Sequence, residues 1–229
     1  MGNGHENRAS DATNGAEVRL LEGALRIFSK KGYEGASVRE IIEEAGVTRP
    51  VLYYYFKNKE DLFRRLVRNC LAGMIADADA VLEEAETCQS CLELLICKAF
   101  DRAENNLDEV RLLVHVIFTP PGQAPGILDE PLLDEWFSRL VDVMHEGLQR
   151  GELSGGEPEA LALAFNALMD FHMMVKSRYP SVTLTPELGK GLVALFLRGA
   201  GPGGVERLPL LNTFQLRPRE AVYGVEDNV

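Results

Sequence analysis

Apolar residues recur at every third or fourth position along nearly the whole chain, and this period constrains the fold more than any other feature. The spacing is that of a helix with one buried face. A strand would instead alternate strictly between apolar and polar residues, and no segment of useful length does so. Glycines, prolines and capping residues divide the pattern into about nine helices. We therefore predict an all-α fold.

Two short helices near the N-terminus, expected over residues 38–45 and 49–56, are separated by three residues, the first of which is a glycine. Ser37 and Glu40 have the spacing of a capping box, which marks the start of the first helix. Gly46 permits the tight turn that sets two helices at a steep angle. This arrangement is typical of a helix-turn-helix, whose second helix enters the major groove of DNA.

The second short helix ends with the aromatic run YYYF. At 3.6 residues per turn, Leu52 and Phe56 share one face and can pack against the preceding helix. Consecutive tyrosines point about 100° apart, so a helix this short cannot bury all three. The alternative, that the whole run is core, conflicts with that geometry. The opposite face is expected to consist of Arg49, Pro50, Tyr53 and Tyr54, with Tyr55 at the flank.

These residue types suit a nucleic-acid surface. A tyrosine ring can pack on thymine methyls and sugars while its hydroxyl reaches a phosphate or a base, and Arg49 can form a bidentate contact with guanine. Lys57 and Lys59 lie beside the expected start of the next helix, which Asn58 can cap and whose free N–H groups also favour phosphate. If the two lysines did not lie beside this helix start, the simpler interpretation would be that both are solvated surface residues.

Charge is distributed unevenly. Residues 16–69 contain 11 Lys and Arg against 8 Asp and Glu, whereas residues 70–229 contain 12 against 25. A polyanion would therefore be attracted to the front of the molecule and repelled by its body.

The segment ALRIFSKKGYEGASVREIIEEAGVTRPVLYYYFKNKEDLF closely resembles the N-terminal signature of the TetR family of bacterial transcriptional regulators, with a match over residues 17–65. The resemblance implies base or sugar contacts from Arg49, Pro50, Val51, Tyr53 and Tyr54, and phosphate contacts from Ser37, Arg39, Thr48, Tyr55 and Lys59. With Val38 and Lys57 these residues form the predicted DNA-binding set. Pro50 and Tyr55 differ from the small residue and the histidine found in many members, which bears on the operator sequence.

The resemblance also implies a function and a domain plan. We expect a cytoplasmic, ligand-responsive, sequence-specific DNA-binding regulator, namely a homodimeric repressor that a small, partly apolar effector releases from its operator. The expected parts are a disordered tail (1–15), the helix-turn-helix domain (16–62), a helical regulatory and dimerisation domain (63–200) and an extended or disordered tail (201–229). The proline-broken loop 119–126 is either a gate to the effector site or a plain surface turn.

In the family that the chain resembles, the last two helices usually form a four-helix bundle with the partner subunit. The expected dimer seam comprises Leu161, Phe165, Leu168, His172, Val175, Leu188, Leu192 and Leu195. Effector contacts are expected among the central helices, from Phe100, His115, Phe118, Trp136, Met144, His145, Met169 and Met173, although ordinary core packing is the more common role of these residue types. Asn166 and Asp170 share a face of an apolar helix and need polar partners, which could be each other, the dimer mate or a ligand.

Other classes have little support in the sequence. The lone pair Cys88 and Cys91 has no second ligand pair, so we expect inert thiols rather than a redox or metal site. No metal spacing, nucleophile–base pair or paired carboxylates suggest an enzyme or a cofactor. The longest apolar stretch (160–175) is too short to span a bilayer, and the N-terminus lacks the apolar core of a signal peptide. An adapter of the same fold that acts through a protein partner is the main alternative.

Overall fold

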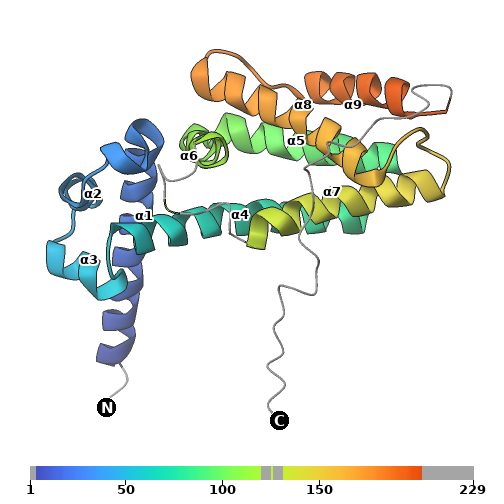
Figure 1. Cartoon of the computed structure of the whole chain (residues 1–229). Helices are drawn as coiled ribbons and strands as arrows, with labels where there is room; N and C mark the ends of the chain where they lie inside the picture. The colour runs from blue at the N-terminus through green and yellow to red at the C-terminus, as the bar shows by residue number, and fades with distance from the viewer. Residues whose placement is uncertain (1–3, 120–124, 126–130, 203–229) are drawn as a thin grey trace, which may run out of the picture. The chain divides into compact units, whose positions relative to one another are not determined.

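The computed structural model describes residues 4–119, 125 and 131–202, and within these residues it contains nine α-helices and no strand. The all-α prediction is confirmed. The helices are α1 (Gly4–Gly35), α2 (Val38–Ala45), α3 (Arg49–Tyr55), α4 (Lys59–Glu84), α5 (Cys88–Asn105), α6 (Leu107–Phe118), α7 (Pro131–Gln149), α8 (Pro158–Arg178) and α9 (Pro186–Ala200) (Figure 1).

The chain divides into two compact units. The N-terminal unit consists of residues 1–70 and 106–128, and the C-terminal unit of residues 71–105 and 129–229. The N-terminal unit therefore contains α1, α2, α3, the first part of α4, and α6. The domain limits expected from the sequence stay predictions, and the expected tail lies outside the described residues from position 203 onward.

The N-terminal unit is built around α1, which packs against α2, α3 and α6 (Figure 1). Phe28 of α1 is completely buried, and its ring meets that of Phe63 edge to face at a centroid distance of 4.9 Å. Ile41 and Leu52 bring the buried faces of α2 and α3 to the same core. The two short helices are thus held by apolar side chains, which leaves their other faces for solvent or a ligand.

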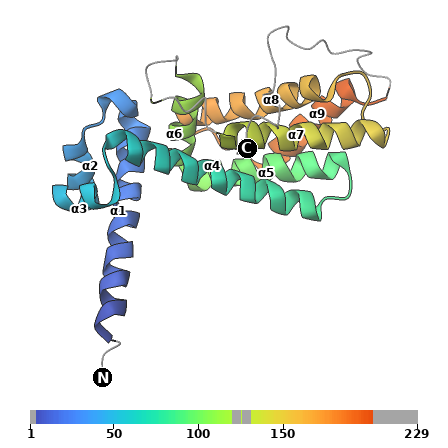
Figure 2. The same ribbon diagram turned by 60° about the horizontal axis from the view of Figure 1, so that its bottom comes forward.

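In the C-terminal unit, α5 packs against α7, α8 and α9, and α8 also contacts α7 and α9 (Figure 2). Phe100 and Phe165 are among the largest fully buried side chains. The Phe165 ring lies 5.6 Å from the Phe196 ring and joins α8 to α9. Lys176 is buried as well, but its ammonium donates to Glu104 at 2.8 Å and so does not leave a charge unpaired.

The first helix is longer than the sequence predicts. Helical backbone begins at Gly4, whereas residues 1–15 were expected to be disordered. No proline interrupts this stretch, and extending an existing helix through a glycine costs only about 1 kcal/mol. Gly32 has φ 68° and breaks the regular helix there, before the last residues of α1.

Two further expectations concern connections. The caps predicted for α2 and α4 are present, and α5 is capped by Thr87. The Thr87 hydroxyl accepts the Ser90 N–H at 3.0 Å, and the Ser90 hydroxyl accepts the Thr87 N–H at 3.1 Å. Of the loop 119–126, only Thr119 and Pro125 are among the described residues.

Candidate nucleic-acid interface

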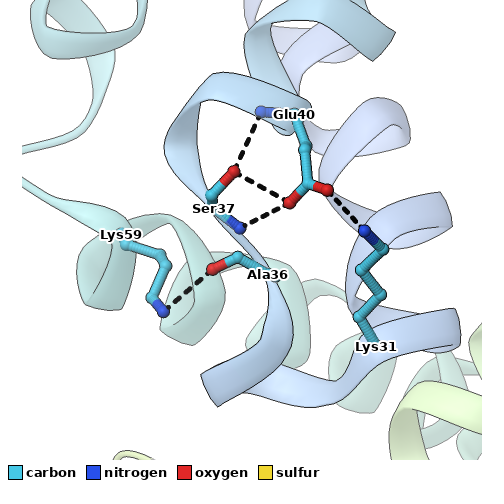
Figure 3. A network of polar contacts seen from close by, with 5 residues as sticks. All are labelled: Lys31, Ala36, Ser37, Glu40 and Lys59. Carbon is cyan, nitrogen blue, oxygen red and sulfur yellow. Dashed lines mark hydrogen bonds and ion pairs between the residues drawn. The ribbon is translucent and has the colours of Figure 1, made fainter.

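A reciprocal pair of hydrogen bonds fixes the start of α2. The Ser37 hydroxyl accepts the Glu40 N–H at 3.2 Å, and Glu40 Oε2 accepts the Ser37 N–H at 3.0 Å, as the sequence predicts (Figure 3). Lys31 of α1 forms an ion pair with the other carboxylate oxygen of Glu40. The Lys31 ammonium, followed by the Ser37 hydroxyl and N–H, lowers the pKa of Glu40 to about 2. The carboxylate therefore stays charged at any physiological pH.

The turn between α2 and α3 depends on one glycine. Gly46 lies in the left-handed region, with φ 62° and ψ 38°. The Gly46 N–H donates to Glu43 O at 3.3 Å and the Val47 N–H donates to Ile42 O at 3.0 Å, which is the bonding pattern of a Schellman motif. A side chain at position 46 would be strained in this conformation, so the glycine determines the sharp exit toward α3.

The faces of α3 divide as the sequence predicts. Leu52 is 0% exposed and Phe56, just after the helix, is 3% exposed, so both belong to the core. Tyr53 is 48% exposed and Tyr54 is 75% exposed. Arg49 and Pro50, one helical turn before the two tyrosines, are exposed as well. Large aromatic rings are rarely left in water without a reason, so this face is a candidate binding surface.

Tyr55 lies between the two faces. It is half-buried, and its ring meets that of Tyr54 edge to face at 5.0 Å and lies 6.3 Å from that of Phe56. These contacts limit the freedom of the Tyr54 ring and hold it on the exposed side of α3.

The polar residues around α3 differ in their availability. Thr48 is exposed and its side chain makes no capping bond, so its hydroxyl can meet a ligand. Arg39 is exposed but pairs with Glu43 at 2.7 Å. The Ser37 hydroxyl is already used in the cap of α2. The side chains of Val38 and Val51 are half-buried.

The two lysines after α3 have different surroundings. Lys57 is exposed, and its ammonium has no partner among the described residues. Lys59 is half-buried, and its ammonium donates to the carbonyl oxygens of Tyr33 at 2.9 Å and Ala36 at 3.1 Å. Between them, Asn58 caps α4 by accepting the Asp61 N–H at 2.8 Å, as predicted.

The residues expected to contact an effector belong to both units of the chain. Phe100, Met144 and Met169 are buried in the core of the C-terminal unit. His145 is exposed and its ring is hydrogen-bonded to Gln149 one turn later in α7. His115 and Phe118 are exposed residues of α6, which belongs to the N-terminal unit, whereas Trp136 and Met173 are half-buried in the C-terminal unit.

A polar chain joins α7 to α8 inside the C-terminal unit. The Trp136 Nε1–H donates to Asn166 Oδ1 at 3.0 Å, and Asn166 Nδ2 donates to Asp170 Oδ2 at 2.6 Å. Burial raises the pKa of Asp170 to about 6, against the opposing effect of the Asn166 hydrogen bond. Asn166 and Asp170 are thus partners of each other, which is one of the options that the sequence left open, and Trp136 is a further partner of Asn166.

The expected dimer residues also separate by exposure. Leu161 and Phe165 are buried within the chain itself, so they face its own core and are not free to meet a partner. Leu168, His172, Val175 and Leu192 are half-buried. Leu188 is 37% exposed and Leu195 is 62% exposed on α9. Because α8 is apolar on nearly all sides, its sequence alone cannot say which side faces inward.

The cysteines and histidines do not form an obvious site. Burial raises the pKa of Cys88 to about 12 and that of Cys91 to about 11, so both thiols are protonated at neutral pH. No cluster of three His, Cys, Asp or Glu side chains with metal-binding geometry occurs in the part of the chain that the structure describes. Within the same residues, no helix has an apolar stretch of the length that a bilayer crossing requires.

The fold and the exposed face of α3 define a helix-turn-helix DNA-binding protein. Residues 20–66 match the family model for bacterial regulatory proteins of the tetR family. The uncharacterized HTH-type transcriptional regulator YezE of Bacillus subtilis is 32% identical over 155 residues, which cover 63% of this chain and 76% of that protein. The chain belongs to the TetR family, whose members are transcriptional regulators rather than enzymes.

Two other similarities extend beyond the DNA-binding segment. The fatty acid metabolism regulator protein of Bacillus subtilis is 27% identical over 147 residues, covering 63% of this chain and 74% of that protein. The crystal structure of the transcriptional regulator FadR from Bacillus subtilis in complex with stearoyl-CoA superposes with a TM-score of 0.68 and 22% identity. The superposition covers 80% of this chain and 98% of the FadR chain.

Two contacts were missed in the sequence. The bonds from Lys59 to Tyr33 and Ala36 span more than twenty residues, and the Trp136–Asn166 bond spans 30. Nothing near either residue in the sequence indicates these contacts, because a lysine near a helix start and a tryptophan on an amphipathic helix occur with many different neighbours. An asparagine in an apolar helix was the one hint that a polar partner existed.

Proposed function

We propose that this protein is a repressor that binds its operator as a homodimer, with α3 of each copy in a major groove, and that a small effector releases it. The observation that carries the DNA contact is the exposure of Tyr53 and Tyr54 on a helix whose other face is core. We assign base or sugar contacts to Arg49, Pro50 and the two tyrosines. We assign phosphate contacts to Thr48 and Lys57, whose polar groups are free among the described residues.

The charge distribution supports this orientation. The excess of lysine and arginine lies in residues 16–69, and the excess of aspartate and glutamate lies after them. DNA phosphates are therefore attracted to the segment that carries α3, and they are repelled by the acidic remainder of the chain. This difference favours binding of the duplex at α3. A protein of this kind acts where the bacterial chromosome is, in the cytoplasm.

Exposed apolar side chains on α8 and α9 support pairing with a second copy. Phe171 is 58% exposed, and Leu188 and Leu195 are exposed on the neighbouring helix. Isolated exposed leucines are common, but large apolar residues on two adjacent helices are typical of an interface. Two copies would also supply two α3 helices, which must reach half-sites about 34 Å apart.

The effector class is suggested by relatives. A curated relative is named for fatty acid metabolism, and a protein of the same fold was crystallised with stearoyl-CoA. We therefore propose acyl-CoA thioesters as the effector class to test first, bound in the C-terminal unit. The effector would lower DNA affinity only if it bound better to a state whose two α3 helices are differently spaced. Coenzyme A without an acyl chain is the matched control.

The test begins with selection of bound duplexes from genomic DNA by the purified full-length protein, followed by affinity measurements on the selected fragment. We expect Tyr54→Ala to lose about tenfold or more in affinity with an unchanged helical signal, because it removes a groove contact. Tyr179→Ala is the control, since Tyr179 is also an exposed tyrosine, 56% exposed, but follows α8. Equal affinities of both variants and the unmodified protein would rule out this role for α3.

A further inference from the structure

The Lys59 ammonium occupies a built site on the protein itself. Nζ lies 2.9 Å from the Tyr33 carbonyl oxygen, 3.1 Å from the Ala36 carbonyl oxygen and 4.1 Å from the centroid of the Tyr33 ring (Figure 3 shows the Ala36 bond). An ammonium group has three N–H donors. Two carbonyls and one ring face therefore occupy its full bonding capacity in the DNA-free protein.

The two carbonyl groups belong to the segment that leads into α2. Gly32 breaks the regular part of α1, and Tyr33 and Ala36 follow it directly before the cap residue Ser37. Ala36 is only 4% exposed, so water has little access to its carbonyl group, although Glu34 and Gly35 before it are exposed. Lys59 thus supplies donors to carbonyl groups at a point where the helical hydrogen-bond ladder is interrupted.

Lys59 is also the first residue of α4, which makes its contacts a link between helices. The Tyr33 ring lies 5.0 Å from the ring of Phe63, one turn further along α4, and 6.1 Å from the ring of Phe28 in α1. The position of the α2 start relative to the first turn of α4 is therefore held by two hydrogen bonds, a cation–π contact and aromatic packing. Since α3 follows α2 after a single tight turn, its direction depends on the same contacts.

We propose that Lys59 is a positioning residue for DNA recognition, which fixes the direction of α2 and α3 from the start of α4 instead of binding a phosphate. The proposal rests on the proposed DNA-binding function. It replaces the phosphate contact that the family resemblance implies for this lysine, and it leaves Lys57, exposed two residues earlier, as the phosphate-binding lysine of this segment.

The experiment compares Lys59→Met, Lys59→Gln and the matched control Lys57→Met in the full-length protein. The probe is a duplex that the unmodified protein selects from a random-sequence pool. Affinity for it is measured over a range of salt concentrations, and unfolding by urea is measured without DNA. Loss of one phosphate contact lowers the slope of log affinity against log salt by about 0.9.

We expect Lys59→Met to lower the affinity about tenfold while the salt slope is unchanged, and to lower the urea midpoint below that of Lys57→Met. Lys59→Gln should retain more affinity than Lys59→Met, because its amide can still donate to a carbonyl. If the methionine variant does not fold, the salt slope and urea midpoint of Lys59→Gln, compared with those of Lys57→Met, decide the question. A slope reduced by about 0.9 in the Lys59 variants would overturn the proposal.

Failure of the proposed function is distinguishable from failure of this proposal. If the unmodified protein enriches no duplex at all, DNA binding itself is refuted. The unfolding measurement still tests Lys59 in that case, because a urea midpoint for Lys59→Met equal to that of Lys57→Met would show that its contacts do not hold the helices.

Discussion

Gly23 of α1 lies directly against Ala45 at the end of α2: a Cβ atom built on the glycine would be 3.1 Å from both the Cβ and the amide nitrogen of Ala45. Both residues are buried, and two helices can approach this closely only where one of them lacks a side chain. The contact fixes the end of α2 immediately before the turn into α3.

A side chain at position 23 should therefore separate these helices. We expect Gly23→Leu to lower the free energy of unfolding by about 2 kcal/mol or more, as overpacking does, and to weaken DNA binding. Gly15→Leu is the control in the same helix, since among the described side chains its Cβ would meet only the Arg19 guanidinium, at 3.6 Å. Urea unfolding checks both, and the idea fails if Gly23→Leu is as stable as Gly15→Leu.

The capping box of α2 provides a second prediction. Ser37→Ala removes the hydroxyl that accepts the Glu40 N–H, and we expect a loss of about 1 kcal/mol in unfolding free energy. Ser37→Thr keeps a hydroxyl acceptor and should recover most of that loss. Thermal unfolding of the three proteins gives the comparison. If alanine is tolerated as well as threonine, then the Lys31–Glu40 pair rather than Ser37 sets the start of α2.

The helix-turn-helix could be predicted because its determinants are local. Ser37 and Glu40 are three residues apart, Gly46 acts through its own backbone, and the burial of Leu52 against the exposure of Tyr54 follows from helical period alone. Each of these features can be read without knowing what lies next to the segment in space.

The remainder of the site depends on contacts between distant residues. Nothing near Lys59 in the sequence indicates that its ammonium would meet the carbonyl of Tyr33 rather than solvent. The inward face of α8 was not predictable either, because nearly every face of that helix is apolar, and Phe165 was consequently assigned to a dimer seam although it is buried in the chain's own core. The residues that pack against a side chain decide which way it faces, and the spacing of apolar residues along the sequence does not specify those residues.

Asp170 predicts a dependence of stability on pH. Burial raises its pKa from 3.8 to about 6, so between these values the folded protein holds a proton that the unfolded chain releases. Stability must therefore fall as pH rises from about 4 to about 6, by up to about 3 kcal/mol. Asp170→Asn cannot titrate, and we expect its advantage over the unmodified protein to grow across this range in urea unfolding. Parallel curves for the two proteins would mean that Asp170 is well hydrated.

The exposed leucines of α9 give the final prediction. Leu195 is 62% exposed and lies two turns after Leu188 on the same side of the helix. A charge in the centre of a paired apolar surface would be desolvated without a partner, so Leu195→Glu should convert the proposed dimer to a monomer. Leu82→Glu is the control, because Leu82 is an exposed leucine of α4, 36% exposed. Sedimentation velocity measures the change, and loss of one of the two α3 helices should also weaken binding to a two-half-site operator by several orders of magnitude. If Leu195→Glu sediments like Leu82→Glu, another surface must join the subunits.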